Sequence, residues 1–161
     1  MIILVMGVAG SGKTTVGGLL ARELGWDFAD ADDFHSAANI AKMAAGQPLT
    51  DEDRAPWLAA LRTHAERHLA ANRSAVIACS ALKESYRRIL MADSPAVRLV
   101  HLHGSRELLL SRLGQRQGHF MKPNLLDSQL AALEPSPQAL TIDISRSPAE
   151  LVAEIRRAFG V

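Results

Sequence analysis

The fold of this chain is decided near its start by residues 2–14, which read Ile2-Ile3-Leu4-Val5-Met6-Gly7-Val8-Ala9-Gly10-Ser11-Gly12-Lys13-Thr14. The part from Gly7 to Thr14 matches G-x-x-x-x-G-K-[ST], the pattern of a phosphate-binding loop. The apolar run before it is rich in β-branched residues, as a buried parallel strand should be. After it, apolar residues recur at helical spacing as far as Leu24, and Gly25 supplies a stop. The sequence therefore predicts a strand, a glycine-rich loop and a helix in the order that a phosphate site requires.

The residue types in this loop indicate how it would bind a nucleotide. Glycines let the backbone curl so that its N–H groups face an anion, and the N-terminus of the following helix adds partial positive charge. Lys13 is expected to reach the β- and γ-phosphates of ATP, and the Thr14 hydroxyl is expected to ligate Mg²⁺. The predicted nucleotide contacts are Gly7, Val8, Ala9, Gly10, Ser11, Gly12, Lys13, Thr14 and Thr15.

Composition narrows the classes of protein to which the chain can belong. Its 161 residues suit one domain with a sizeable core, and 48% apolar with 22% charged residues is an ordinary globular composition. A formal net charge of +1 gives no electrostatic case for a nucleic-acid or membrane partner. The apolar run at residues 2–6 is too short to span a bilayer. The single cysteine, Cys79, excludes an internal disulfide and fits a reducing cytoplasm.

Hydrophobic patterning beyond the loop predicts strands that alternate with helices. Further strands are expected at residues 26–29, 74–79, 97–102 and 140–144. Helices are expected at 39–45, 52–71, 80–91, 105–116, 125–133 and 148–159, with Thr50 and Ser105 as N-caps and Pro148 in a first turn. Such alternation implies a single α/β domain over 1–161, with a five-stranded parallel sheet flanked by helices, of the P-loop NTPase type.

A phosphate loop alone leaves the function open, because switches, motors and small-molecule kinases share it. The chain lacks an Asn-Lys-x-Asp guanine-reading motif, and neither the third nor the fourth strand ends in the aspartate of an ordinary Walker B motif. What the chain does have is an acidic pair after the second strand, a helical insertion at about 35–72, and an arginine-flanked loop at about 117–124. That layout is typical of nucleoside-monophosphate-kinase-like enzymes, in which a lid closes over ATP.

Longer motifs make the resemblance more specific. They are Asp30-Ala31-Asp32-Asp33-Phe34-His35, Pro48-Leu49-Thr50-Asp51-Glu52-Asp53-Arg54-Ala55-Pro56-Trp57-Leu58, Cys79-Ser80-Ala81-Leu82-Lys83, Gly118-His119-Phe120-Met121 and Ser128-Gln129. Together they resemble the gluconokinases of the small phosphate-loop type, from about residue 3 to the last helix. The resemblance implies ATP- and Mg²⁺-dependent phosphorylation of D-gluconate to 6-phospho-D-gluconate, at the terminal hydroxyl, by a cytoplasmic enzyme that forms a homodimer. It also implies that residues 35–72 bind substrate, that 117–124 is the lid, and that His119 contacts substrate.

The acidic pair is the predicted centre of the chemistry. Asp30 and Asp32 stand two apart, so on an extended segment they share a face at the carboxyl end of a strand, where α/β sheets bind ligands. One carboxylate could contact Mg²⁺, while the other could orient the acceptor hydroxyl and accept its proton. The spacing itself is compatible with either order. We assign the metal to Asp30 and the base to Asp32, and we expect His35 to hydrogen-bond sugar hydroxyls.

Two sets of cations are expected to serve the substrate and the transferring phosphoryl group. Gluconate carries one carboxylate, which requires a cation, and the candidates are Arg54, Lys83 and Arg87. Arg112 and Arg116 are four apart, hence on one helix face directly before the lid, where they could stabilise charge on the γ-phosphoryl oxygens or stack on adenine. An ordinary surface charge is the alternative for each of these residues.

Two other functions are compatible with the same fold. One is another small-molecule kinase, such as a shikimate-kinase-like enzyme, although Cys79-Ser80-Ala81 stands where that family has a glycine triplet. The other is a nucleotide-dependent switch or binding module without transfer chemistry, against which the acidic pair and the missing guanine motif count. Release of ADP with and without gluconate separates all three.

Overall fold

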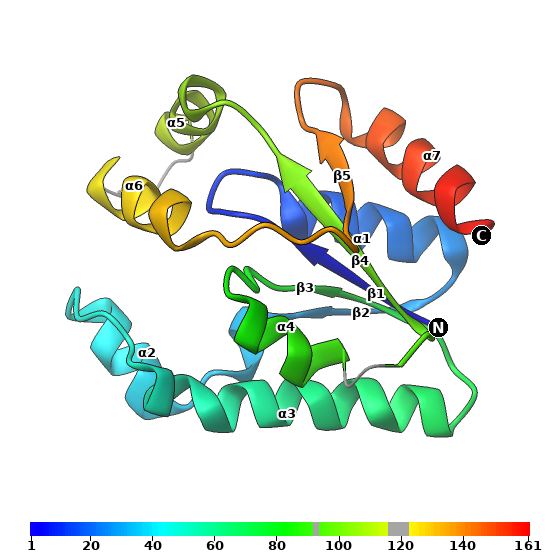
Figure 1. The fold of residues 1–161 in the computed structure, drawn as a ribbon, viewed down its shortest axis with the longest axis horizontal. Helices are drawn as coiled ribbons and strands as arrows, with labels where there is room; N and C mark the ends of the chain where they lie inside the picture. The colour runs from blue at the N-terminus through cyan, green and yellow to red at the C-terminus, as the bar shows by residue number, and fades with distance from the viewer. Residues whose placement is uncertain (92–93, 116–122) are drawn as a thin grey trace.

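The computed structural model describes residues 1–91, 94–115 and 123–161, and its centre is a parallel β-sheet (Figure 1). The strands are β1 (Ile2–Met6), β2 (Asp27–Asp30), β3 (Ala75–Ala78), β4 (Val97–His103) and β5 (Leu140–Asp143). They lie in the order β2-β3-β1-β4-β5, and each neighbouring pair is parallel. The predicted five-stranded parallel sheet is therefore confirmed.

Helices cover both faces of this sheet, as right-handed connections between parallel strands require. They are α1 (Lys13–Leu24), α2 (Ala37–Ala44), α3 (Asp51–Ala70), α4 (Glu84–Met91), α5 (Arg106–Gly114), α6 (Pro123–Ala132) and α7 (Pro148–Phe159). A short 3₁₀ helix, η1 (Ala31–Phe34), directly follows β2 and was not predicted. In Figure 1, α3 and α4 lie below the sheet, and α1 and α7 lie against its other side.

The central strand β1 shows why the core has two halves. All five of its residues are buried, and successive side chains point to opposite faces. Ile3 and Val5 pack with residues of α1 and α7, whereas Ile2, Leu4 and Met6 pack with residues of α3 and α4. A strand buried on both faces reads as a continuous apolar run, which is how the sequence marks it.

Local signals set most helix boundaries. Thr50 Oγ1 accepts from the N–H of Asp53, and the Asp53 carboxylate accepts in turn from the N–H of Thr50, which completes a capping box at the start of α3. Ser105 likewise caps α5 by accepting from the N–H of Leu108. Pro148 stands at the first position of α7, where a missing N–H costs no intrahelical bond.

Two predicted boundaries are wrong. Residues 80–83 do not open a helix: Ala81 has φ 43°, in the left-handed region, and α4 begins only at Glu84. Lys83 therefore precedes the helix instead of lying on its face. In addition, α5 ends at Gly114 and Gln115 lies in a turn, so the helix that carries Arg112 ends before its predicted last residue, which itself lies outside the described residues.

Candidate active site

The phosphate loop joins β1 to α1 as predicted, and its glycines stand where other residues would not fit. A Cβ on Gly7 would lie 2.7 Å from the carbonyl oxygen of Leu102 and 2.7 Å from Ser11 Oγ. Gly12 caps α1 at φ 89°, in the region that favours glycine. Because α1 begins at Lys13, its first N–H groups, which have no partner within the helix, lie at the loop. The loop thus has the tight curvature and the positive helix end of an anion site.

Thr14 and Asp30, the predicted metal ligands, are hydrogen-bonded to each other. Thr14 Oγ1 donates to Asp30 Oδ2 at 2.7 Å, and Asp30 Oδ1 accepts from the N–H of Asp32 at 3.1 Å. A hydroxyl that donates its only hydrogen to a carboxylate keeps its lone pairs for other partners. The Thr14 oxygen is thereby oriented as a ligand, and the pair offers the oxygen donors that Mg²⁺ prefers.

The charged residues of the loop and of the acidic pair meet around the end of β3. The Cys79 thiol, which follows that strand, lies within electrostatic range of Lys13, Asp32 and Asp30. Burial raises the pKa of this thiol to about 12, so Cys79 is protonated at neutral pH and is a core residue, not a nucleophile. The structure therefore brings the predicted phosphate lysine, metal carboxylate and base to one place.

His35 continues the site away from the loop. Its imidazole stacks on the Trp57 indole, with ring centroids 4.6 Å apart and planes 7° from parallel, and Trp57 Nε1 donates to the carbonyl oxygen of Ala31 at 2.6 Å. Burial lowers the pKa of His35, the Asp32 carboxylate opposes this effect, and the Arg54 guanidinium adds to it. A neutral imidazole can both donate and accept, which suits contacts with hydroxyl groups.

Two of the predicted carboxylate-binding cations, Arg54 and Lys83, converge on one tyrosine. Lys83 Nζ lies 5.3 Å from the centroid of the Tyr86 ring, and the Arg54 guanidinium carbon lies 5.8 Å from it. The Asp51 carboxylate accepts from Lys83 Nζ at 2.9 and 3.1 Å and from the Tyr86 hydroxyl. This contact lowers the pKa of Asp51, chiefly through the Tyr86 and Lys83 hydrogen bonds, and raises that of Lys83. Arg54 Nη1 lies 3.9 Å from the same carboxylate, so the structure contains a site where two cations and a hydroxyl surround a carboxylate.

Arg87, the third predicted carboxylate-binding cation, is not placed to contact a substrate. It is buried with 1% of its surface exposed, and its guanidinium donates to the carbonyl oxygens of Ala81, Leu82 and Pro135 at 3.0, 2.9 and 3.2 Å. It also pairs with Glu84 at 2.9 Å. The guanidinium holds the segment between β3 and α4 in its non-helical form, so Arg87 has a structural role.

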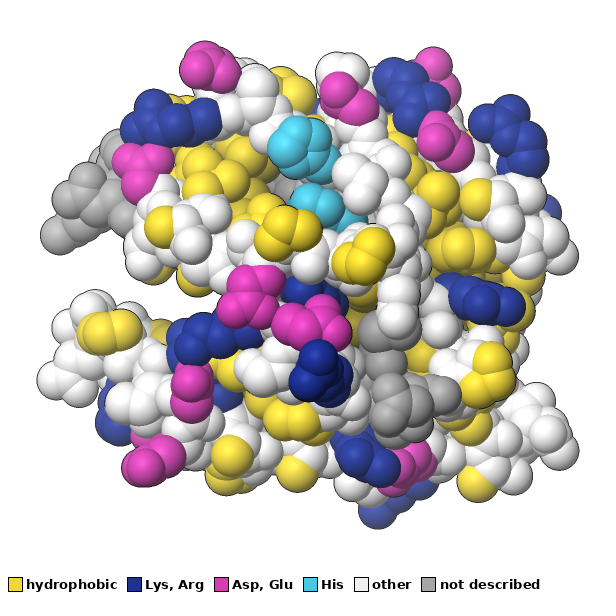
Figure 2. All heavy atoms as spheres, viewed as in Figure 1, with side chains coloured by type: hydrophobic (Ala, Val, Ile, Leu, Met, Phe, Trp, Pro, Cys, Tyr) yellow, Lys and Arg dark blue, Asp and Glu magenta, His cyan; other side chains and the backbone are white. Residues whose placement is uncertain are grey.

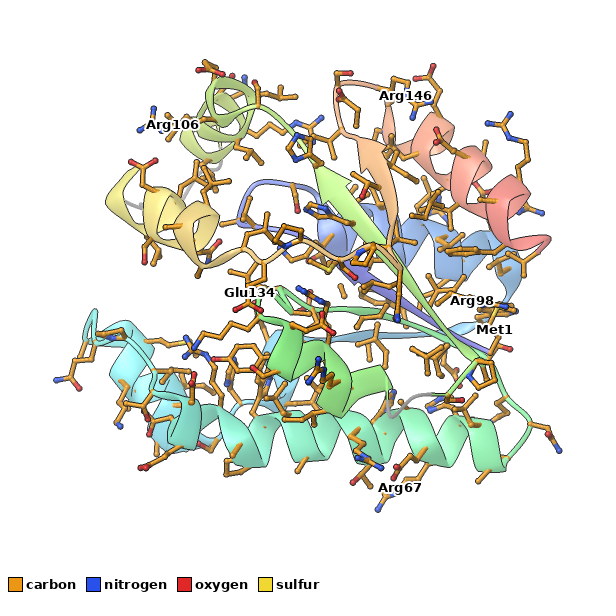
Figure 3. The ribbon with its side chains drawn as sticks, viewed as in Figure 1. Met1, Arg67, Arg98, Arg106, Glu134 and Arg146 are labelled. Atoms are coloured by element: carbon orange, nitrogen blue, oxygen red, sulfur yellow. The ribbon has the colours of Figure 1, made fainter. Side chains whose placement is uncertain are left out.

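Arg112 lies beside the phosphate loop. Its Nη2 donates to the carbonyl oxygen of Ile144 at 2.6 Å, and its Nη1 would lie 3.7 Å from a Cβ on Gly12. A pocket of about 190 Å³ opens there, lined by Gly10, Gly12, Thr15, Val16, Arg112, Arg146, Pro148 and Leu151. Arg146, labelled in Figure 3, comes from the connection between β5 and α7. Arg116, His119 and most of the predicted lid lie outside the described residues.

The surface is hollowed on the side where these residues gather. Figure 2 shows a notch between the part of the molecule that holds α5 and α6 and the part that holds α2 and α4, with Lys, Arg, Asp and Glu side chains at its inner end. A larger cavity of about 810 Å³ lies elsewhere, lined among others by Arg88, Pro95, Arg98 and Phe159. Pro95 and Arg98 stand at the amino end of β4, opposite the carboxyl ends where parallel sheets bind ligands, so we assign the chemistry to the notch.

Sequence reasoning missed four residues of this region: Asp51, Tyr86, Gln129 and Arg146. Asp51 appears only within a family-like motif, and its hydrogen bonds with Lys83 and Tyr86 each span more than thirty positions of the chain. Gln129 reaches the phosphate loop from α6, where its Oε1 accepts from the N–H of Ala9 at 2.7 Å. The only signal for Asp51 and Gln129 was their place in these motifs, and no motif pointed to Arg146.

Within residues 1–91, 94–115 and 123–161, no helix combines the length and the apolar character that crossing a membrane requires.

Comparison with known proteins finds relatives that cover nearly the whole chain. A family model described as shikimate kinase matches residues 9–155. A probable gluconokinase of Xenopus tropicalis is 46% identical over 173 residues, covering 96% of this chain and 91% of that protein. A gluconokinase of Gluconobacter oxydans is 46% identical over 160 residues, covering 98% and 90%. The crystal structure of a gluconokinase from Sinorhizobium meliloti superposes with a TM-score of 0.83 at 44% identity, covering 94% of this chain and 87% of that one.

Proposed function

The chain belongs to the shikimate kinase family and, within it, to the gluconokinases, and on that premise we propose that it transfers the γ-phosphoryl group of ATP to D-gluconate, forming 6-phospho-D-gluconate and ADP. The single observation that carries the proposal is the hydrogen bond from Thr14 of the phosphate loop to Asp30, whose other oxygen accepts from the N–H of Asp32, so that the acidic segment lies beside the loop. The cationic site that already holds the Asp51 carboxylate adds support for an acid as the substrate.

ATP is held by the loop from Gly7 to Thr15. Ser11 Oγ is fully buried there and has no hydrogen-bond partner among the described residues, which supports a loop built for a further polar ligand. The pocket next to Gly12 fits the nucleoside, with the planar Arg112 guanidinium available to an aromatic base. Lys13 supplies the charge opposite the β- and γ-phosphates.

Thr14 and Asp30 fit a magnesium ion, because both are oxygen donors and their mutual hydrogen bond leaves the Thr14 lone pairs available. When bound, Mg²⁺ neutralises charge on the phosphate oxygens and orients them. Asp30 keeps the Thr14 hydroxyl hydrogen away from the ligand side, and it also fixes the start of η1 through the N–H of Asp32. The same carboxylate therefore sets the geometry of both the metal site and the base.

Asp32 is the proposed general base. Its side chain is exposed at the carboxyl end of the sheet, on the first turn of η1. The terminal hydroxyl oxygen of gluconate forms the new bond to the γ-phosphorus while the bond to the leaving oxygen of ADP breaks, and the hydroxyl proton passes to the Asp32 carboxylate. Lys13 and Arg112 stabilise the charge that spreads over the transferring group.

Gluconate is held by residues that follow η1 and residues of α3, of α4 and of the segment before α4. Arg54 and Lys83 are the proposed partners of its carboxylate, and the Tyr86 hydroxyl lies at the same place. Asp51 keeps Lys83 and Tyr86 together until the substrate carboxylate shares them. The neutral His35 imidazole, fixed by its stacking on Trp57, contacts the hydroxyl groups between the two ends of the substrate.

A coupled assay for ADP release tests the function directly. With purified protein, ATP and Mg²⁺, turnover is expected with D-gluconate, whereas shikimate and buffer alone should give only background. Turnover with shikimate in place of gluconate would support the other kinase, and nucleotide hydrolysis that ignores both acids would support a switch. The relatives at 46% identity are gluconokinases, which favours the first outcome.

Two further properties belong to the proposal. Cys79 is a free, buried cysteine, and a protein without a disulfide is compatible with a reducing compartment, which supports a cytoplasmic enzyme. The expectation that the protein forms a homodimer depends on the family resemblance alone. Gel filtration with light scattering tests it.

A further inference from the structure

The peptide group between Val8 and Ala9 is held at both ends. Its carbonyl oxygen accepts from Lys13 Nζ at 3.0 Å, and its N–H donates to Gln129 Oε1 at 2.7 Å. An N–H can only donate, so the oxygen of the Gln129 amide, not its nitrogen, must face the loop. Because a peptide group is planar and stiff, one rigid unit links Gln129 to the lysine of the phosphate loop.

This link affects the ammonium group of Lys13 in two ways. A hydrogen bond accepted by Gln129 from the N–H polarises the peptide and strengthens the bond that its carbonyl oxygen accepts from the ammonium. It also resists rotation of the peptide, which would carry the carbonyl oxygen away from Lys13. The position of the ammonium therefore depends on a side chain 120 residues further along the chain than Ala9.

The helix that carries Gln129 is itself fixed to two other elements. On the α5 side, Arg106 donates to both oxygens of Asp127 at 2.7 and 3.0 Å. Beyond the end of α6, Glu134 Oε2 accepts from the N–H of Glu84 at 2.5 Å, and Figure 3 shows Glu134 beside the start of α4. Gln129 is thus presented to the loop by a helix with anchors on both sides of it.

We propose that Gln129 is a positioning residue for phosphoryl transfer, acting through the Val8–Ala9 peptide to hold the ammonium of Lys13 in place. The inference rests on the proposed function, since contact of Lys13 with the phosphates of ATP is what the positioning serves. It adds that α6 takes part in nucleotide binding through the backbone of the phosphate loop and without touching the nucleotide itself.

A double-mutant cycle tests the link. Parent, Gln129→Met, Lys13→Met and the double variant are compared by the dissociation constant of a magnesium-bound, non-hydrolysable ATP analogue, and by the single-turnover rate wherever it is measurable. Methionine keeps the length of the side chain but has no oxygen to accept from Ala9. Gln129→Met is expected to weaken binding or slow transfer about tenfold, the worth of one good hydrogen bond. In the Lys13→Met background the same change should have almost no effect.

Equal fold-changes in both backgrounds would overturn the proposal, because they would mean that Gln129 acts independently of Lys13. Gln138→Met is the matched control, since Gln138 is exposed and lies outside the notch, and it should leave both quantities unchanged. Melting curves of all variants show whether the comparison is made on folded protein.

Gln129→Glu provides a second variant that does not depend on the folding of Gln129→Met. It keeps an acceptor oxygen for Ala9, so kcat should stay close to that of the parent, while its negative charge should raise the KM for ATP. A loss of kcat as large as that of Gln129→Met would refute the role of the acceptor. A parent protein that binds the ATP analogue but does not phosphorylate gluconate would refute the proposed function and leave the coupling measurable.

Discussion

Replacement of Asp30 by asparagine is expected to weaken the affinity of the enzyme for magnesium without removing its base. In the parent, one oxygen of Asp30 accepts from Thr14 Oγ1 at 2.7 Å and the other from the N–H of Asp32 at 3.1 Å. Both partners are donors, and asparagine has only one acceptor oxygen. Its amide oxygen will face the Asp32 N–H, which cannot turn round, so its NH₂ group will face Thr14.

The changed hydrogen bonding of Thr14 determines how much magnesium affinity Asp30→Asn loses. Its oxygen must then accept from the asparagine NH₂ group, which uses a lone pair, and its own hydrogen must point elsewhere, including toward the ion. The loss of a hydrogen bond to a charged group is worth about 1.5–3 kcal/mol, which corresponds to about 10- to 100-fold in apparent magnesium affinity. The fold should be little affected, because Thr14 and Asp30 lie at the surface end of the sheet.

The assay is a magnesium titration of turnover at saturating ATP and gluconate, run for Asp30→Asn beside Asp32→Asn. For Asp30→Asn the half-saturating magnesium concentration should rise by the factor given above, and excess metal should restore most of the rate. For Asp32→Asn, kcat should fall about 10²- to 10⁴-fold at every magnesium concentration, the usual worth of a general base. A loose transition state, with little proton removal, would place the loss at the low end.

The reverse pattern would refute this assignment. If Asp32→Asn were rescued by magnesium and Asp30→Asn were not, the two carboxylates would have exchanged roles, and the Thr14–Asp30 hydrogen bond would be unrelated to the metal. A rise in the KM for gluconate alone in Asp32→Asn would reduce Asp32 to a substrate-orienting group.

Three other predictions concern charged residues of α2, α3 and α4 and of the segment before α4. In steady-state kinetics, Lys83→Met should raise the KM for gluconate about 10- to 100-fold and leave the KM for ATP unchanged. The reason is that it removes a charged partner of the substrate carboxylate. A change confined to the KM for ATP would contradict this. Arg87→Met should lower the free energy of unfolding by about 3 kcal/mol in urea titrations while kcat/KM is kept, because three carbonyl oxygens lose their donor; loss of activity in a folded variant would contradict the structural role. The hydrogen bond from Lys42 lowers the pKa of Asp53 to about 2 from its usual 3.8, so the stability that this carboxylate contributes is complete above about pH 4 and lost as the pH falls towards 2. Melting temperatures of parent and Asp53→Asn should therefore converge over that range, and a constant difference would exclude Asp53 as the titrating group.

Short-range signals in the sequence were sufficient for the frame of the site. The phosphate loop, the buried strand before it and the capping box at Thr50 each depend on residues within a few positions of one another. Their geometry is set by backbone conformation and by local hydrogen bonds, which spacing predicts directly. The sequence also predicted that Asp30 and Thr14 lie close together, because the carboxyl ends of β1 and β2 must lie at the same edge of a parallel sheet.

The roles of the individual cations could not be obtained in this way. Arg87 and Lys83 are four positions apart and look alike in the sequence, yet Arg87 is 1% exposed, whereas the Lys83 side chain is 36% exposed and pairs with Asp51. The difference arises because Ala81 takes a left-handed conformation, which turns two carbonyl oxygens toward Arg87 and ends any helix before Glu84. The spacing of charged residues in the sequence does not predict that backbone conformation.

The sequence by itself determined the strand, loop and helix of the phosphate site, and it determined the family to which the chain belongs. Both conclusions depend on motifs of contiguous residues. Only the tertiary structure decided which groups meet across the site: Asp51 with Lys83 and Tyr86, and Gln129 with the peptide that holds Lys13. Such contacts depend on how helices pack on the sheet, which is fixed by burial of apolar side chains over the whole domain. The polar residues that meet there are brought together by packing in which they take little part.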